Sequence, residues 1–139
     1  MLYHYTTWNG FKIFEEKVLK VSSRYAAYTY YAGYYPPLVF LSEDKIWEPT
    51  VQAATKEFYW ESCGSCPDTY QQLEIPCWRF TVDSDIEVEP AIKVCSDLGL
   101  SAMIEHGIKL GADPTKWWVS RKSLAVTQAA QWEGVWSIK

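Results

Sequence analysis

Residues 78–83 read Trp-Arg-Phe-Thr-Val-Asp, and this stretch gives the clearest secondary-structure signal in the chain. Apolar Trp78, Phe80 and Val82 alternate with polar residues, which is the period of a strand that turns one face to the core and the other to solvent. We therefore predict a half-buried strand here. Such alternation is typical of antiparallel sheets.

Other strands are expected outward from this one, from shorter patterns. They cover residues 2–5, 18–22, 38–41, 117–120 and 134–138. Residues 124–130 fit either a strand or a helical turn. The tyrosine-rich stretch that ends at Tyr35 has no sustained period, so we expect an irregular loop or a short helix there.

Helices are expected at three places. Thr6 or Thr7 can cap the first, whose apolar residues recur at helical spacing up to about Lys17. Residues 51–60 permit a second, and residues 62–75 then form a polar loop. Ser96 or Asp97 can cap a third that ends near Gly111. The chain is therefore expected to be a single α+β domain over residues 1–139, with a mostly antiparallel, split sheet and flanking helices.

Composition excludes several classes of function. The 139 residues are 48% apolar and 22% charged, which is typical of one folded core. The net charge is −4 and the basic residues are scattered along the chain without a polybasic run, so nucleic-acid binding through bulk electrostatics is not indicated. No apolar run approaches the ~20 residues that span a membrane, and no signal peptide is visible. We expect a cytoplasmic protein.

Aromatic residues make up 17% of the chain, and six tyrosines lie between Tyr25 and Tyr35. Buried tyrosines need partners for their hydroxyl groups, whereas partly exposed ones suit a binding surface. Both interpretations stay open. The second one supports an alternative function, a non-catalytic protein-binding module or an inhibitor made by a phage.

Four cysteines leave the question of a metal open. Cys63 and Cys66 form a Cys-x-x-Cys turn, and Cys77 and Cys95 would complete four zinc ligands. Cys77 follows after ten residues and Cys95 after seventeen more, so the second pair lacks the close spacing of a zinc ribbon. Reduced thiols are favoured over zinc or an oxidised pair.

The chain has only two histidines, and one of them falls within a predicted strand. His4 lies between Tyr3 and Tyr5, where an imidazole can bind a ribose or phosphate oxygen or be satisfied within a core. His106 fits a cation near a helix C-terminus. Gly-x-Gly-x-x-Gly, phosphate-loop, Gly-x-Ser-x-Gly and His-Glu-x-x-His motifs are absent.

The opening of the chain resembles domains with the ADP-ribosyltransferase fold. The segments that carry the resemblance are Leu-Tyr-His-Tyr-Thr-Thr at 2–7, Leu-Lys-Val-Ser at 19–22 and Pro-Pro-Leu-Val-Phe-Leu-Ser at 36–42. Arg79 and the stretch 117–120 also fit. This superfamily includes the DarT-type DNA-modifying toxins, the tRNA 2′-phosphotransferases and many short phage and bacterial proteins.

The resemblance implies an NAD-binding protein that transfers ADP-ribose to a host macromolecule, as a toxin or a phage counter-defence protein would. His4 and Thr6 are carried over to ribose binding and Ser42 to the second strand position, with Tyr5 and Arg79 as further cofactor contacts.

The resemblance also implies a catalytic carboxylate, because an oxocarbenium-like sugar gains from a nearby negative charge. Glu133 is the candidate, although no Glu-x-Glu or Gln-x-Glu surrounds it. Glu43 and Glu105 are substitutes without a motif. A domain that binds a nucleotide without transferring it is the alternative.

Overall fold

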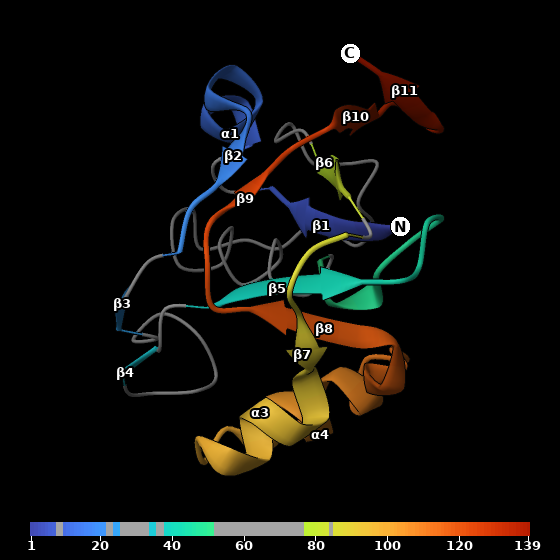
Figure 1. Ribbon diagram of the computed structural model, residues 1–139. Coiled ribbons are helices and arrows are strands. Elements are labelled where there is room, and N and C mark those ends of the chain that lie inside the picture. Colours follow the sequence, from blue (N-terminus) through green and yellow to red (C-terminus); the bar gives the residue numbers. More distant parts are fainter. Residues whose placement is uncertain (8–9, 22–23, 26–33, 36–37, 52–76, 84) are drawn as a thin grey trace.

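One seven-stranded sheet organises the computed structural model, which describes residues 1–7, 10–21, 24–25, 34–35, 38–51, 77–83 and 85–139. The strand order is β11-β10-β6-β1-β5-β8-β7, and every pair is antiparallel (Figure 1). The strands are β1 (Leu2–Thr6), β5 (Val39–Ser42), β6 (Trp78–Val82), β7 (Glu89–Pro90), β8 (Trp117–Ser120), β10 (Gln128–Trp132) and β11 (Trp136–Ile138). The prediction of an α+β domain with a mostly antiparallel sheet is confirmed.

Two short ribbons accompany the sheet. One pairs β2 (Val18–Leu19) with β9 (Leu124–Ala125), and the other pairs β3 (Arg24–Tyr25) with β4 (Tyr34–Tyr35). Residues 124–130, which fitted a strand or a helical turn, are therefore mostly strand. The rest of the tyrosine-rich stretch, most of the helix expected at 51–60 and the loop expected at 62–75 lie outside the described residues.

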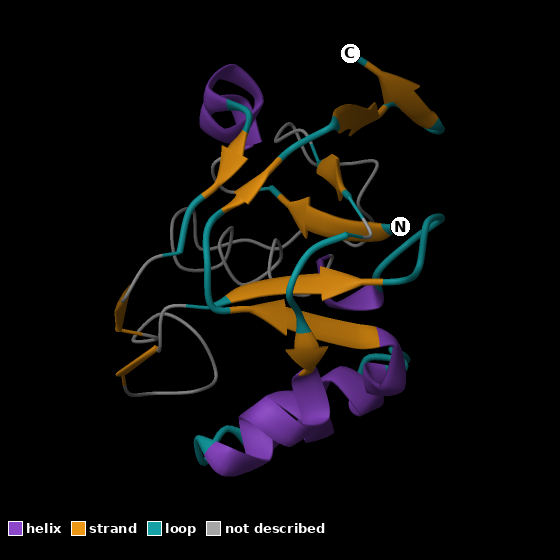
Figure 2. Cartoon of the chain, in the orientation of Figure 1, coloured by secondary structure: helices purple, strands orange, loops and turns teal. Residues whose placement is uncertain are grey.

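Helix α1 (Gly10–Glu16) lies at one end of the molecule, and α3 (Ala91–Asp97), α4 (Ser101–Lys109) and a 3₁₀ turn at Pro114–Lys116 lie at the other end (Figure 2). The first and third predicted helices are thus present, but the cap predicted for the third helix is wrong. Ser96 and Asp97 end α3, and α4 begins after Leu100 without a side-chain cap. The turn between the two helices runs through Gly99 at a φ of 71°.

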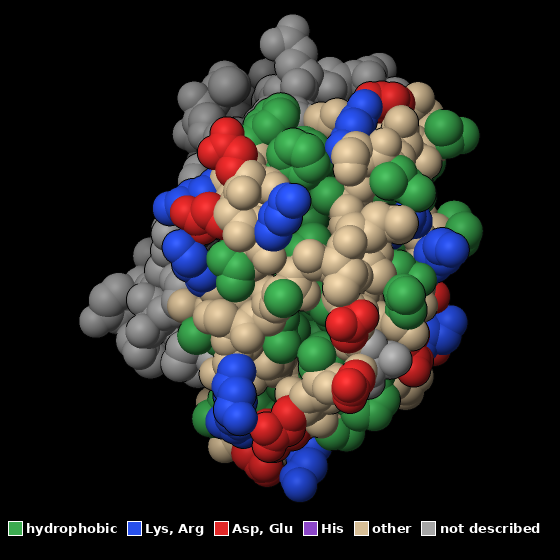
Figure 3. Space-filling model, turned by 45° about the horizontal axis from the view of Figure 1, so that its top comes forward, with side chains coloured by type: hydrophobic (Ala, Val, Ile, Leu, Met, Phe, Trp, Pro, Cys, Tyr) green, Lys and Arg blue, Asp and Glu red, His purple; other side chains and the backbone are tan. Residues whose placement is uncertain are grey.

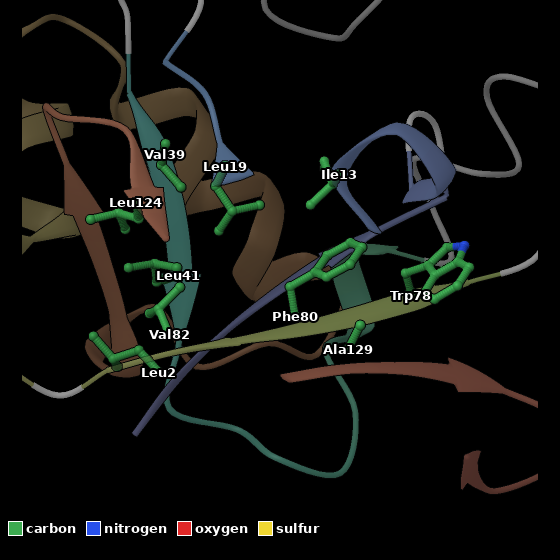
Figure 4. Close-up of a cluster of buried hydrophobic side chains, with 10 residues drawn as sticks. All are labelled: Leu2, Ile13, Leu19, Val39, Leu41, Trp78, Phe80, Val82, Leu124 and Ala129. Carbon is green, nitrogen blue, oxygen red and sulfur yellow. The ribbon is translucent and has the colours of Figure 1, made fainter. Parts of the chain in front are cut away.

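A hydrophobic cluster lies on one face of the sheet, between the sheet and the cover formed by α1 and the β2–β9 ribbon (Figure 4). Its buried members are Leu2, Ile13, Leu19, Val39, Leu41, Trp78, Phe80, Val82, Leu124 and Ala129. Trp78 ends the cluster, with its ring centroid 5.7 Å from that of Phe80 and 5.0 Å from that of Phe14. This packing fixes α1 against β6.

The second face of the sheet is covered as well. Leu38 and Val119 pack there against Ala91 and Val94 of α3. Farther along the same face, Val51 and Cys77 pack with Tyr5 and a group of tryptophans. All five residues of β6 are therefore buried, so the prediction of a half-buried strand is wrong. The cover comes from residues far away in sequence, which alternation within β6 cannot reveal.

Candidate functional site

The central strand β1 is paired unequally with its two neighbours. It pairs with β6 at five positions from Leu2 to Thr6, but with β5 only where Tyr3 lies opposite Ser42. Beyond that pair the two strands diverge (Figure 1). His4 lies at this point, and its Nδ1 is 2.8 Å from the carbonyl oxygen of Phe40 in β5. The His4 side chain thus bonds β5 at the point where backbone pairing between β1 and β5 ends.

The hydrogen bond to Phe40 determines which nitrogen of His4 carries the proton, and burial determines the charge of the ring. A carbonyl oxygen only accepts, so Nδ1 carries the proton and donates it, and Nε2 keeps its lone pair when the ring is neutral. Burial lowers the pKa of His4 below its ordinary value of 6.5, against the opposing effect of the Phe40 carbonyl. At pH 7 the partly buried ring is therefore a neutral imidazole with Nε2 as an acceptor.

This lowered pKa predicts a pH dependence of stability. Because the unfolded chain binds the proton more readily, the contribution of His4 is complete above the unfolded pKa of 6.5 and is lost as the pH falls towards the folded pKa. His4→Asn keeps a donor for Phe40 but does not titrate. Urea unfolding at pH 7.5 and at pH 5.5 should show a smaller decline in the variant, and an equal decline would contradict the assignment.

The structure brings only part of the predicted constellation together. Strand pairing places Thr6 on the same face as His4 and Phe80, two residues along β1. The predicted cofactor residues Tyr5, Ser42 and Arg79 lie on the opposite face. His4 and Thr6 therefore remain one candidate site. Tyr5, Ser42 and Arg79 belong instead to a set of contacts on the opposite face of the sheet.

These contacts form a clamp on residues 43–47, which we call the clamped loop. The Tyr5 hydroxyl donates to the carbonyl of Asp44, and Arg79 Nη1 donates to that of Lys45 at 2.6 Å. Trp136 Nε1 donates to the carbonyl of Ile46 at 2.7 Å. Donors from β1, β6 and β11 thus fix three successive carbonyls of the loop.

Three further contacts hold the start of the clamped loop. The Ser42 hydroxyl accepts a hydrogen bond from the backbone N–H of Asp44 at 3.1 Å. The Asp44 carboxylate pairs with Lys116 at 3.2 Å, and the carbonyl of Lys116 accepts from the backbone N–H of Glu43. The hydroxyl groups of Tyr5 and Ser42 and Nη1 of Arg79 are therefore engaged within the chain.

Arg79 is the central group of the clamp. Its side chain is 5% exposed, and its guanidinium carbon lies 5.4 Å from the ring centroid of Tyr3 and 5.0 Å from that of Trp136. Burial raises the pKa of Tyr5, and the neighbouring Arg79 opposes this rise. The Tyr5 hydroxyl therefore stays protonated and serves as a donor.

The predicted carboxylate lies away from His4. Glu133 occupies the turn between β10 and β11, where Gly134 adopts a φ of 86°. Lys139 Nζ lies 2.6 Å from the Glu133 carboxylate, and this hydrogen bond keeps the pKa of Glu133 below its usual range. β6 separates β10 from β1, which corresponds to two strand spacings of about 4.8 Å.

The substitute residues are no closer to a common site. Glu43 is exposed at the start of the clamped loop, and Glu105 is exposed on α4. His106 lies in the last turn of α4, at the C-terminal position that the sequence predicts. Lys and Arg side chains are dispersed among acidic ones on the face shown in Figure 3.

Two of the four cysteines fall within the described residues. Cys77 precedes β6 and Cys95 lies in α3, both are buried, and burial raises the pKa of Cys95. Cys63 and Cys66 lie outside the described residues. In the part of the chain that the structure describes, no three histidine, cysteine or acidic side chains gather as metal ligands.

Sequence reasoning missed the aromatic group that surrounds the clamp. The ring centroid of Trp132 lies 5.2 Å from that of Trp47 and 5.1 Å from that of Trp136. Beside them, Glu48 is 5% exposed and accepts a hydrogen bond from Trp117 Nε1 at 3.1 Å. Glu48 and Trp117 are 69 residues apart, so no local pattern links them.

The described tryptophans do not form the exposed face that the protein-binding alternative needs. All of them are buried or partly buried: Trp47, Trp78, Trp117, Trp118, Trp132 and Trp136. They pack against the sheet and against one another. The tyrosine-rich half of that alternative lies outside the described side chains.

No protein-family model, curated protein or solved structure matches this chain. Among the described residues, no helix has the length and apolar character needed to cross a membrane. Assignment of a function therefore rests on the geometry around His4.

Proposed function

We propose that the protein binds a nucleotide, with NAD as the leading candidate, beside His4 where β1 and β5 diverge. The observation that carries this proposal is the state of His4. Its Nδ1 is bound to Phe40, its ring is neutral, and Nε2 remains an acceptor at the end of a backbone ladder.

The chemistry of a ribose suits this arrangement. Ribose hydroxyls donate hydrogen bonds, and a neutral imidazole whose other nitrogen is held by a carbonyl offers them a fixed acceptor. Thr6 adds a hydroxyl on the same face of β1. The resemblance of residues 2–7 to ADP-ribosyltransferase-like domains supports the same two residues.

The proposal covers binding and not transfer. ADP-ribose transfer needs a carboxylate beside the reacting sugar. Glu133 pairs with Lys139 in the turn between β10 and β11, away from His4, so we assign it no catalytic role. A nucleotide-binding domain without transfer activity is the form that the geometry supports best.

Calorimetric titration of NAD into the purified protein tests the proposal. The wild-type protein should bind saturably, and His4→Ala should weaken binding by about tenfold or more, which corresponds to the loss of roughly one hydrogen bond in a polar site. His106→Ala is the matched control. It removes the second histidine of the chain, which lies on α4, and should leave binding unchanged. Absence of binding to the wild-type protein, or equal binding to His4→Ala, would refute the assignment.

A further inference from the structure

The outer edge of β11 is the second feature of the sheet that points to a function. Among the strands that the structure describes, β11 pairs through its backbone with β10 alone. It lies at the upper right margin of the fold in Figure 1. A strand edge of this kind presents unpaired backbone groups to another chain.

The register of the β10–β11 hairpin shows which groups face outward. Lys139 N donates to Ala129 O at 3.0 Å, and Glu133 N donates to Val135 O at 2.9 Å. In an antiparallel pair, alternate residues direct their backbone groups to the partner, so Ser137 faces β10. The N–H and C=O groups of Trp136 and Ile138 therefore point to the open edge.

Exposed apolar side chains accompany this edge. Val135, which precedes β11, is 68% exposed, and Ile138 within β11 is 63% exposed. Ile46 is 74% exposed, and its carbonyl accepts the hydrogen bond of Trp136 Nε1, which places it beside β11. These residues form an apolar border along an edge with unpaired backbone groups.

We propose that a second copy of this chain pairs with β11 in an antiparallel arrangement about a two-fold axis through Ser137. Trp136 of each copy then lies opposite Ile138 of the other, and each such pair exchanges two backbone hydrogen bonds. Trp136 and Ile138 lie on the same face of the sheet, because they pair with Trp132 and Ala130. The two apolar side chains therefore meet across the axis.

The charges at the ends of β11 match the same arrangement. Glu133 and Lys139 lie at opposite ends of the strand and pair within one chain at 2.6 Å. An antiparallel second copy brings its Lys139 opposite Val135, next to Glu133. Acidic and basic ends thus meet across the axis, whereas a parallel arrangement would bring like charges together.

The opposite edge of the sheet is protected against such pairing. β7 has only two residues, Pro90 and the partly exposed Glu89, which pairs with Arg121 at 2.7 Å. Short strands, proline and charge are the features that keep strand edges from associating. β11 (Trp136–Ile138) is short but holds neither proline nor a charged residue, and the charged Glu133 and Lys139 lie outside the strand, so it is the edge of the described sheet that is better suited to pairing.

Light scattering after size exclusion, over a range of protein concentrations, tests the dimer. A single short strand pair buries little surface, so we expect a concentration-dependent dimer. Ile138→Pro removes only an outward N–H and leaves the donors to β10 in place, and Ile138→Lys adds an edge charge. Both variants should be monomeric wherever the wild-type chain is dimeric.

Ile108→Lys on α4 is the matched control, because Ile108 is 59% exposed and lies on another element. It should dimerise like the wild-type chain. A wild-type chain that remains monomeric up to about 1 mM overturns the proposal. So does an Ile138→Pro variant that dimerises as the wild-type does, with an unchanged circular dichroism spectrum. Neither result bears on nucleotide binding at His4.

Discussion

Gly10→Ala should lower the free energy of unfolding by about 2–3 kcal/mol, in the range known for overpacked cores. A Cβ added at Gly10 would lie 2.0 Å from Cδ1 of Trp78, well inside contact distance. The indole has no room to yield, because Phe14 and Phe80 stack on it and Phe11 meets its edge. The better helix propensity of alanine offsets only a part of this cost.

A double-mutant cycle isolates the clash. Trp78→Phe replaces the indole with a smaller ring and removes no hydrogen bond seen among the described residues, where the buried Trp78 Nε1 has no partner. Gly10→Ala should therefore cost at least about 1 kcal/mol less in the Trp78→Phe background. Urea unfolding of the four proteins gives the coupling energy. A stability of Gly10→Ala equal to that of the wild type would show that α1 does not pack on β6 as described.

Arg79→Ala should be at least as costly, with a loss of about 3 kcal/mol. The change removes the donor to the Lys45 carbonyl and empties the space between the rings of Tyr3 and Trp136. Amide hydrogen exchange in residues 43–47 should rise together with the loss of stability. The clamped loop is then the region in which the effect is seen.

Arg79→Met separates the two contributions. Methionine fills the space between the rings but donates no hydrogen bond, so it should recover part of the stability and leave loop exchange high. Arg121→Ala is the control for loss of an arginine at an exposed ion pair with Glu89, and it should cost no more than about 1 kcal/mol. Unchanged exchange of residues 43–47 in Arg79→Ala would contradict the role of Arg79 in the clamp.

Local patterns predicted the strands well and the layers less well. β1, β5, β6 and β8 lie where alternation or short apolar runs placed them. α3 escaped prediction, although Ala91, Val94 and Cys95 have helical spacing and are buried. The sequence prediction began the third helix at Ser96 or Asp97, which instead end α3, so residues 91–95 were left out of it.

The candidate site shows the same boundary between local and long-range information. The period of two in a strand already separates His4 from Tyr5, so their placement on opposite faces could be predicted from sequence. The placement of Ser42 and Arg79 depends on the register of β5 and β6 against β1, which no local pattern contains. The bond from His4 to Phe40 likewise joins residues 36 positions apart.

Nitrogen NMR of the two imidazoles, recorded with and without NAD, tests nucleotide binding at His4 most directly. Without NAD, His4 should appear as the neutral tautomer with its proton on Nδ1, as the bond to Phe40 requires. Saturating NAD should then shift the Nε2 resonance of His4 and leave His106 unchanged. An Nε2-protonated His4, or a His4 spectrum that NAD does not alter, would contradict the proposed site.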